Sequence, residues 1–267
     1  MTPRNRIVTD QIAGATFTAA SVHHIRGATE PRHGHDRFHV SYVWSGRGHS
    51  ERRSIRWDRR DAIWCYPAGA VHRWIPSSPR TRSLNIELSE ARLTELGCTE
   101  GEAFEHLAKR PWLETELVRL LFELSGPPED REASVSMQLA EILGSQSEHE
   151  PRGCPPWAAV IRELLEDRWD DPLELRDLAE AAGVHPVTIS RSFRRLFGDT
   201  FARFRRRLRV ERSLGPLLDE RMPLSELALA CGFADQSHFT RAFREFVGQP
   251  PNALRRHLQS DGNPHRG

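Results

Sequence analysis

One short segment occurs twice near the C-terminal end of this 267-residue chain, and the repeat limits the fold more than any other feature. The first copy, LAEAAGVHPVTISRSFRRLFG, begins at Leu178, and the second, LALACGFADQSHFTRAFREFVG, begins at Leu227. The matching positions, 50 residues apart, are Ile189, Arg191, Phe193 and Gly198 with Phe239, Arg241, Phe243 and Gly248. Self-similarity at a fixed spacing indicates one supersecondary unit that is used twice.

Each copy has the pattern of a helix-turn-helix unit. A short apolar helix ends at a glycine, Gly183 or Gly232, which can adopt the left-handed conformation that ends a helix. A second helix follows at once, because Pro186 suits a first helical position and Asp235 is a good N-cap. The sequence therefore predicts two helix-turn-helix units in tandem.

The second helix of each unit has an apolar face and a polar face. The apolar faces, which must be buried, carry Ile189, Phe193 and Leu196 in the first copy and Phe239, Phe243 and Phe246 in the second. The predicted DNA-contacting residues on the opposite faces are Val187, Ser190, Arg191, Arg194, Arg195, Gln236, His238, Thr240, Arg241 and Arg244. We predict that Arg191 and Arg241 read bases, because arginine can bond guanine at two acceptors. The other arginines are expected to hold phosphates.

Arginine is concentrated from the first reading helix onward. Between Arg191 and Arg212 there are nine arginines and two acidic residues, although the whole chain has a net charge of only +1. Such a cluster predicts a phosphate-binding surface, and a solvated helical face is the alternative interpretation. The segment 200–220 has the apolar spacing of one long helix, which Gly215 and Pro216 would kink. A stiff helix would hold two reading heads for successive major grooves, about 34 Å apart.

The stretch from Leu178 to Arg256 resembles the DNA-binding domain of the AraC family, and the segment GFADQSHFTRAFREFVGQPP carries much of the likeness. The resemblance includes both copies in the right order. It implies a seven-helix bipartite domain that binds asymmetric sites at bacterial promoters. One departure is His185, where the family often has a capping serine.

The remainder of the chain divides into strand and helix patterns. From Thr16 to about Leu88, short alternating runs broken by glycine and charged turns predict strands. From Glu90 to Ser145 the period becomes helical and predicts a helical pair, with a leucine stripe at Leu113, Leu117, Leu120, Leu121 and Leu124. Glycine, serine and proline concentrate in residues 144–157, which predicts a domain boundary there.

Two histidine-bearing segments resemble the paired motifs of the cupin barrel. HGHDRFHVSYVWSGRG supplies His33, His35 and His39, and PAGAVH supplies His72. The resemblance implies that these four residues are candidate metal ligands, with His39 at the position that is glutamate in metal-binding cupins. Neutral imidazole suits zinc, nickel, copper or iron(II), and His-x-His on a strand places both rings on one face. The alternatives are an organic effector, or histidines that are satisfied by hydrogen bonds alone.

Aromatic residues are dense in the same region, at Trp44, Trp57, Trp64, Tyr66 and Trp74. Such residues can line a pocket for an apolar or aromatic effector. We therefore take Trp44, Trp64, Tyr66 and Trp74 as candidate effector-binding residues. The alternative interpretation places most of them in the core of the barrel, because the strand register that would decide between these roles cannot be read from the sequence.

Several function classes do not fit the chain. No apolar run approaches the roughly 20 residues that span a bilayer, and the N-terminus lacks a secretory pattern, so we expect a cytoplasmic protein with no membrane partner. Its four cysteines stand singly, which argues against a disulfide framework and against a thiolate zinc site.

These observations predict an α+β protein of two domains. We expect a cupin-like sensor and dimerisation domain over residues 1–148, with the barrel at about 15–88 and helices at about 89–146. A linker over 149–156 and an all-α AraC-type DNA-binding domain over 157–260 would follow.

The predicted function is sequence-specific transcription regulation without enzymatic activity. The expected partners are double-stranded promoter DNA, a small-molecule effector, RNA polymerase and a second copy of the chain. A divalent transition metal, Zn, Ni or Fe, is the cofactor that the histidines would hold. The rival hypothesis is a metal-dependent cupin enzyme, such as a dioxygenase, in which the DNA-binding domain is an accessory.

Overall fold

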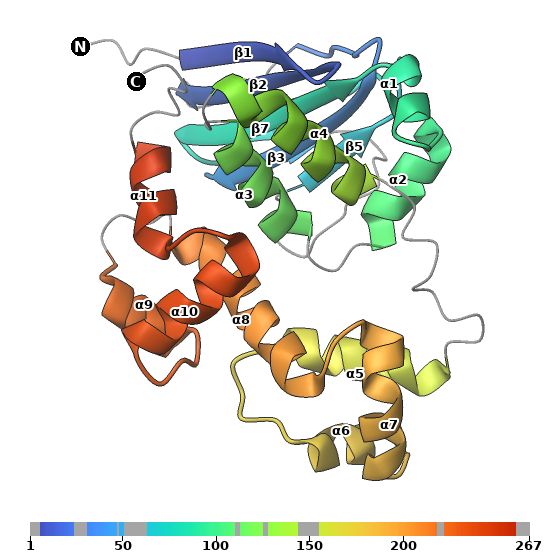
Figure 1. Cartoon of the computed structure of the whole chain (residues 1–267), viewed down its shortest axis with the longest axis vertical. Helices are drawn as coiled ribbons and strands as arrows, with labels where there is room; N and C mark the ends of the chain where they lie inside the picture. The colour runs from blue at the N-terminus through green and yellow to red at the C-terminus, as the bar shows by residue number, and fades with distance from the viewer. Residues whose placement is uncertain are drawn as a thin grey trace. The chain divides into compact units, whose positions relative to one another are not determined.

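The computed structural model describes residues 6–23, 31–46, 48–50, 63–109, 113–124, 128–143, 155–217 and 222–259 (Figure 1). Of these, the residues up to 143 together with those from 252 onward form one compact unit, and residues 155–251 form a second. Trp57 and nearly all of the predicted linker lie outside the described residues. No described helix is both long enough and apolar enough to cross a membrane.

The first unit contains a five-stranded antiparallel sheet in the order β1-β2-β7-β3-β5. Its strands are β1 (Arg6–Ile12), β2 (Ala15–His23), β3 (Phe38–Ser45), β5 (Ile63–Tyr66) and β7 (Arg80–Leu88). A separate ribbon pairs β4 (Gly48–Ser50) with β6 (Trp74–Pro76). The described strands thus form an open sheet and a ribbon, and they do not close into the predicted barrel.

Strand β1 lies before the predicted start of the strand region. It is joined to β2 by the two-residue loop Ala13-Gly14, whose φ angles are 51° and 70°. Positive φ at both central residues is typical of the turns that suit the twist of a hairpin. Glycine reaches this conformation freely but alanine does not, so the loop lacked the usual sequence signal of two permissive residues.

The two faces of the sheet differ in chemistry. Phe38, Val40 and Tyr42 of β3 pair with Leu88, Ile86 and Leu84 of β7, and all six of these side chains are buried. The alternate positions pair His39 with Glu87 and Ser41 with Asn85, so a polar row runs along the opposite face. One face therefore serves as a hydrophobic core and the other can carry polar chemistry.

Helices α1 (Glu90–Glu95), α2 (Glu100–Lys109), α3 (Leu113–Glu123) and α4 (Pro128–Leu143) follow the sheet. The prediction of a helical pair was therefore wrong. Gly97, at φ 79°, separates α1 from α2. Thr99 and Glu102 then start α2 by exchanging side-chain and backbone hydrogen bonds of 2.7 and 3.3 Å, which is a capping box.

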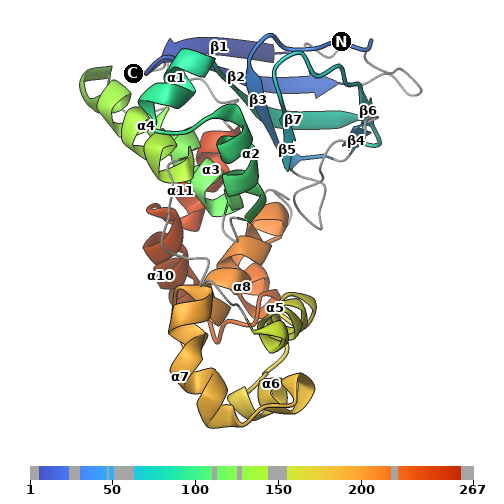
Figure 2. The same cartoon turned by 90° about the vertical axis from the view of Figure 1, so that its right-hand side faces the viewer.

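The apolar face of the sheet is covered by helices (Figures 1 and 2). The Tyr42 hydroxyl on β3 donates to a carboxylate oxygen of Glu114 on α3 over 3.1 Å, and both side chains are buried. The leucine stripe Leu113, Leu117, Leu120, Leu121 and Leu124 is buried as well. The stripe thus packs within a single copy of the chain, which is the second of the two roles expected of it.

The second unit is helical. Its helices are α5 (Pro156–Asp167), α6 (Leu175–Ala182), α7 (Pro186–Phe197), α8 (Phe201–Leu217), α9 (Leu224–Ala230) and α10 (Gln236–Val247), and α11 (Pro251–Gln259) follows them. The long helix predicted over 200–220 is α8, and Pro216 lies in its last turn. Helix α8 contacts α7, α9 and α10, and it lies between the two predicted units.

We expect the Tyr42→Phe variant to lower the free energy of unfolding by about 1–3 kcal/mol, because it removes a hydrogen bond to a buried carboxylate. Urea denaturation followed by circular dichroism measures this change. The matched control is Tyr66→Phe, which alters a buried tyrosine on the other face of the sheet. A loss for Tyr42→Phe below 0.5 kcal/mol, on the order of a neutral surface substitution, would contradict the assigned role.

Candidate nucleic-acid interface and histidine cluster

The turns of the two helix-turn-helix units share one backbone geometry. Gly183 and Gly232 have φ angles of 64° and 73°. In both turns the amide of the next residue donates to the carbonyl four residues before the glycine, over 3.0 Å and 2.9 Å respectively. This pattern is typical of a helix that ends in a left-handed residue, so the repeat in the sequence is also a repeat in the backbone.

The reading helices α7 and α10 begin with side-chain caps. Asp235 accepts a hydrogen bond of 2.7 Å from the backbone amide of His238. At the matching place in the first unit, Nδ1 of His185 accepts from the amide of Val187 over 3.3 Å, and Pro186 occupies the first turn. His185 therefore caps α7 in place of the serine that is common in the AraC family, with a longer hydrogen bond.

The predicted faces of α7 and α10 are divided as expected. All six residues of the apolar stripes are buried: Ile189, Phe193, Leu196, Phe239, Phe243 and Phe246. Eight of the ten predicted DNA-contacting residues are exposed, namely Val187, Ser190, Arg191, Arg194, Arg195, Gln236, Arg241 and Arg244, while His238 and Thr240 are half-buried. The side chains that could meet DNA therefore lie on the accessible side of each helix.

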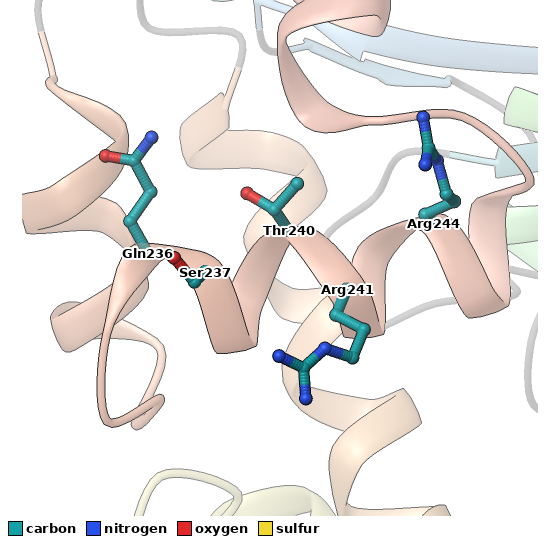
Figure 3. Close-up of a pocket in the computed structure, with 5 residues that line it drawn as sticks. All are labelled: Gln236, Ser237, Thr240, Arg241 and Arg244. Atoms are coloured by element: carbon teal, nitrogen blue, oxygen red, sulfur yellow. The ribbon is translucent and has the colours of Figure 1, made fainter.

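The outer face of α10 is hollowed into a shallow pocket (Figure 3). It is lined by Gln236, Ser237, Thr240, Arg241 and Arg244. Four of these residues were predicted from the helical spacing, and Ser237 was missed. Ser237 is exposed and lies three residues before Thr240, so the same spacing would have placed it on this face.

In the first unit, a backbone scaffold brings two histidine-bearing segments together. His33 and His72 form an isolated antiparallel bridge, with amide-to-carbonyl hydrogen bonds of 3.0 and 2.8 Å. The amide of Gly69 donates to the His35 carbonyl over 2.6 Å. The residue positions of the two predicted motifs are therefore fixed by main-chain contacts as well as by side chains.

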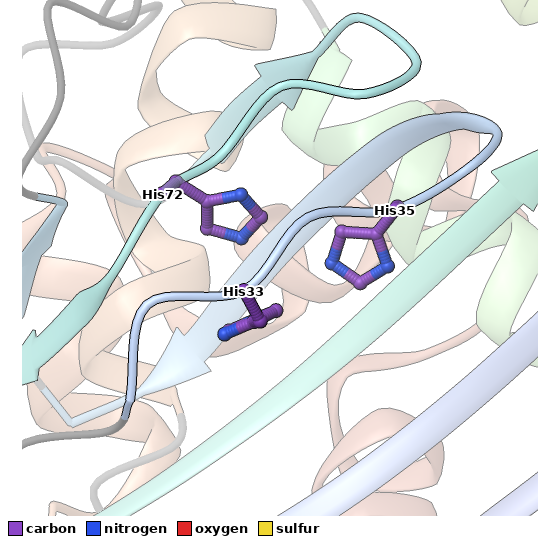
Figure 4. Close-up of side chains that lie close together, drawn as sticks. All are labelled: His33, His35 and His72. Atoms are coloured by element: carbon purple, nitrogen blue, oxygen red, sulfur yellow. The ribbon is translucent and has the colours of Figure 1, made fainter.

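Three histidine rings gather on this scaffold (Figure 4). The ring centroids of His33 and His72 are 4.5 Å apart, and those of His35 and His72 are 5.2 Å apart. One ring nitrogen from each of these three residues lies within 4.8 Å of the other two. The structure therefore brings together three of the four histidines that the sequence singled out.

His39, the fourth predicted histidine, belongs to a second group with His35 and Glu87. The Nδ1 atom of His35 lies 2.8 Å from Oε1 of Glu87, and Nδ1 of His39 lies 3.7 Å from the same oxygen. Glu87 was not predicted. Its position in β7 gave a signal only as a polar residue between buried Ile86 and Leu88, and its pairing with His39 depends on strand register.

The electrostatics of the cluster separate a carboxylate from neutral rings. His39 and His35 beside the Glu87 carboxylate hold its pKa at about 2, although burial acts in the opposite direction. Burial lowers the pKa of His72 to about 4, and burial together with the neighbouring His39 lowers the pKa of His35. At neutral pH the cluster is thus expected to hold an anionic carboxylate and uncharged imidazoles at His35 and His72.

The aromatic candidates have different surroundings. Trp64 and Tyr66 are buried in a hydrophobic cluster with Val43 and Ala70, and Trp74 packs against it. The Tyr66 ring stacks on His72 with a centroid distance of 3.8 Å. Trp44 is half-buried, and its indole Nε1 is buried without a hydrogen-bond partner among the described residues.

Residues 178–257 match a family model described as a helix-turn-helix domain. A curated relative, the uncharacterised HTH-type transcriptional regulator YijO of Escherichia coli, is 27% identical over 60% of this chain and 61% of its own length. The HTH-type transcriptional regulator GlxA of Rhizobium meliloti is 32% identical over 46% of this chain and 38% of its own.

The C-terminal segment is an AraC-type helix-turn-helix domain. A solved transcriptional regulator of Chromobacterium violaceum, described as containing an AraC-type DNA-binding domain, is 25% identical and covers 38% of this chain and 91% of that chain, with a TM-score of 0.36. The chain spans less than two thirds of the length of YijO and of GlxA. The assignment therefore applies to the matched segment.

Within this AraC-type domain, the arginines of α8 are largely used inside the fold. Arg205 donates to the backbone carbonyls of Leu173, over 2.7 Å, and Asp171, just before α6. Arg209 donates to the carbonyl of Gly232, over 2.6 Å, in the turn between α9 and α10. The two arginines thus connect the central helix to both helix-turn-helix units.

A further ion-pair group joins α8 to the second reading helix. Arg203 contacts Asp199 at 2.7 Å and Glu245 at 2.9 Å, and Arg206 lies 3.5 Å from Glu245. The guanidinium of Arg207 lies over the ring of Phe246 at 6.0 Å. The predicted phosphate-binding surface therefore has its exposed arginines on α7, whereas these α8 arginines contact groups within the AraC-type domain.

We expect Gly232→Ala to destabilise the AraC-type domain more than Gly183→Ala. Each change strains a left-handed residue by about 1–2 kcal/mol. A Cβ at Gly183 meets no atom within 4 Å, whereas at Gly232 it lies 3.0 Å from the Arg209 guanidinium and must displace it. The two variants form a matched pair in urea denaturation, and equal losses of stability would show that the Arg209 contact contributes nothing.

Proposed function

We propose that the protein is a sequence-specific DNA-binding transcription regulator that uses both helix-turn-helix units on one DNA molecule. The single observation that carries the proposal is the pair of matched reading helices, each buried by its apolar stripe and each presenting exposed arginines. Exposed arginine on a helix that can enter a major groove is the group best suited to bond guanine. Arg191 and Arg241 occupy equivalent positions and are proposed to read bases.

The proposal assigns the remaining polar residues by chemistry. Arg194, Arg195 and Arg244 lie in the last turn of their helices and are proposed to hold phosphates. Gln236 and Thr240 line the same face as Arg241 and can bond base edges. Helix α8, which contacts both units, is proposed to keep the two reading heads at a fixed spacing.

The first unit is proposed to hold the effector, in a cupin-like barrel of which the described strands form part. The polar row on one face of the sheet, next to the aromatic cluster of Trp64, Tyr66 and Trp74, supports this assignment. A second copy of the chain and RNA polymerase are further proposed partners. The names of YijO and GlxA describe regulators, so the rival hypothesis of a cupin enzyme is not proposed.

The DNA upstream of the protein's own gene is the first target for a footprinting assay. We expect the wild-type chain to protect two half-sites about one helical turn apart. Arg191→Ala should relax sequence preference in one half-site and Arg241→Ala in the other, each by about 1–3 kcal/mol, because each removes one guanine contact.

The matched control is Arg168→Ala, which removes an exposed arginine that is paired with Asp171 outside both helix-turn-helix units. It should leave the footprint unchanged. Uniform weakening over all sequences by Arg191→Ala or Arg241→Ala would instead make that residue a phosphate contact. If wild-type chain gave no footprint on any tested promoter fragment at low salt, the proposed function would be abandoned.

A further inference from the structure

Each histidine of the group His33, His35 and His72 has its Nδ1 atom engaged by an oxygen. Nδ1 of His33 lies 3.1 Å from the Pro31 carbonyl, and Nδ1 of His72 lies 3.2 Å from the Ala70 carbonyl. Nδ1 of His35 lies 2.8 Å from the Glu87 carboxylate. These oxygens can only accept, so in each ring Nδ1 carries the proton and Nε2 keeps its lone pair.

This arrangement is the one that metal-binding histidines use. A ligating histidine donates its other ring N–H to a carboxylate or a backbone carbonyl, which fixes the tautomer and the orientation of the ring. Here three rings share that arrangement, and one nitrogen of each lies within 4.8 Å of the others. Small rotations of the rings would bring all three to the zinc–nitrogen distance of about 2.0–2.1 Å.

A hydrogen-bonded network without an ion does not account for the group. Nε2 of His35 is buried and has no hydrogen-bond partner among the described residues. Buried polar atoms that lack a partner are rare, because each costs about 1–3 kcal/mol. The nearby carboxylate of Glu87 favours a cation over an anion as the missing partner.

We propose that His33, His35 and His72 bind one divalent transition-metal ion through Nε2, and that Glu87 acts as a positioning residue by holding His35 in the ligating tautomer. The backbone bridge between His33 and His72 fixes two of the ligands before the ion arrives. The second group, His35 with His39 and Glu87, is not the ion site, because it would need the Nδ1 atom of His35 that already contacts Glu87.

The first test is titration of the untagged, chelator-treated full chain with Zn²⁺ by calorimetry and with Co²⁺ by visible absorption. We expect one ion per chain and Co²⁺ bands typical of nitrogen ligands. Glu87→Gln should weaken Zn²⁺ binding by about 10- to 100-fold, as loss of an outer-shell partner does. His33→Ala, His35→Ala and His72→Ala should each weaken it more than Glu87→Gln.

The matched control is His49→Ala, which removes an exposed histidine on β4 in the same unit and should leave the affinity unchanged. Circular dichroism and thermal melting in chelator show whether each variant folds, and His33→Gln replaces His33→Ala if that variant does not. Wild-type affinity no higher than that of His35→Ala would overturn the proposal. Loss of binding in Glu87→Gln with full binding in His33→Ala would overturn it too, because the ion would then sit in the second group.

A regulatory role for this ion as the effector rests on the proposed function. Promoter-fragment affinity of the wild-type chain, with and without Zn²⁺, tests that role, and His35→Ala serves as the variant that should not respond. DNA binding by His35→Ala in chelator separates the two failures. If it binds DNA but the wild-type chain takes up no Zn²⁺, the metal site alone is refuted. If wild type takes up Zn²⁺ but binds no DNA, the proposed function is refuted.

Discussion

The burial of one apolar stripe on each reading helix is the interaction on which the rest of the DNA-binding unit depends. Phe193 packs edge-on against Phe204 of α8, with ring centroids 5.6 Å apart, and Phe239 and Phe243 are fully buried in the second unit. Because a helix has only one side to bury, this packing determines which residues face the solvent. The arginines are exposed as a consequence of where the phenylalanines go.

Charge alone gave a misleading view of the same region. The arginines on α7 and those on α8 look alike in the sequence, yet the first group is exposed and several of the second bond to carbonyls and carboxylates of neighbouring elements. Arginine can serve in both ways because its planar group offers several donors on a long stem. What distinguishes the two uses is the tertiary contact of α8, which local composition does not encode.

The sequence predicted best the features that depend on local spacing. The glycine turns, the cap at Asp235 and the buried faces of α7 and α10 all follow from patterns within a few residues. Features that depend on strand pairing were beyond its reach: β1 was missed because its hairpin loop contains Ala13, and Glu87 was missed because its partner is 48 positions away at His39. The separation of α1 from α2 could have been read from Gly97 and the Thr99–Glu102 pair, which were overlooked.

Strand β3 has a further consequence for how the first unit can respond to a bound molecule. Its successive residues point alternately to the histidine side, at His39, and to the helix side, at Tyr42, whose hydroxyl reaches Glu114 of α3. A packed interior resists compression, so displacement of this strand from one side is transmitted to what rests on the other. The strand is thus a common wall between two compartments, and the helices behind it are placed to sense mechanically what happens in front of it.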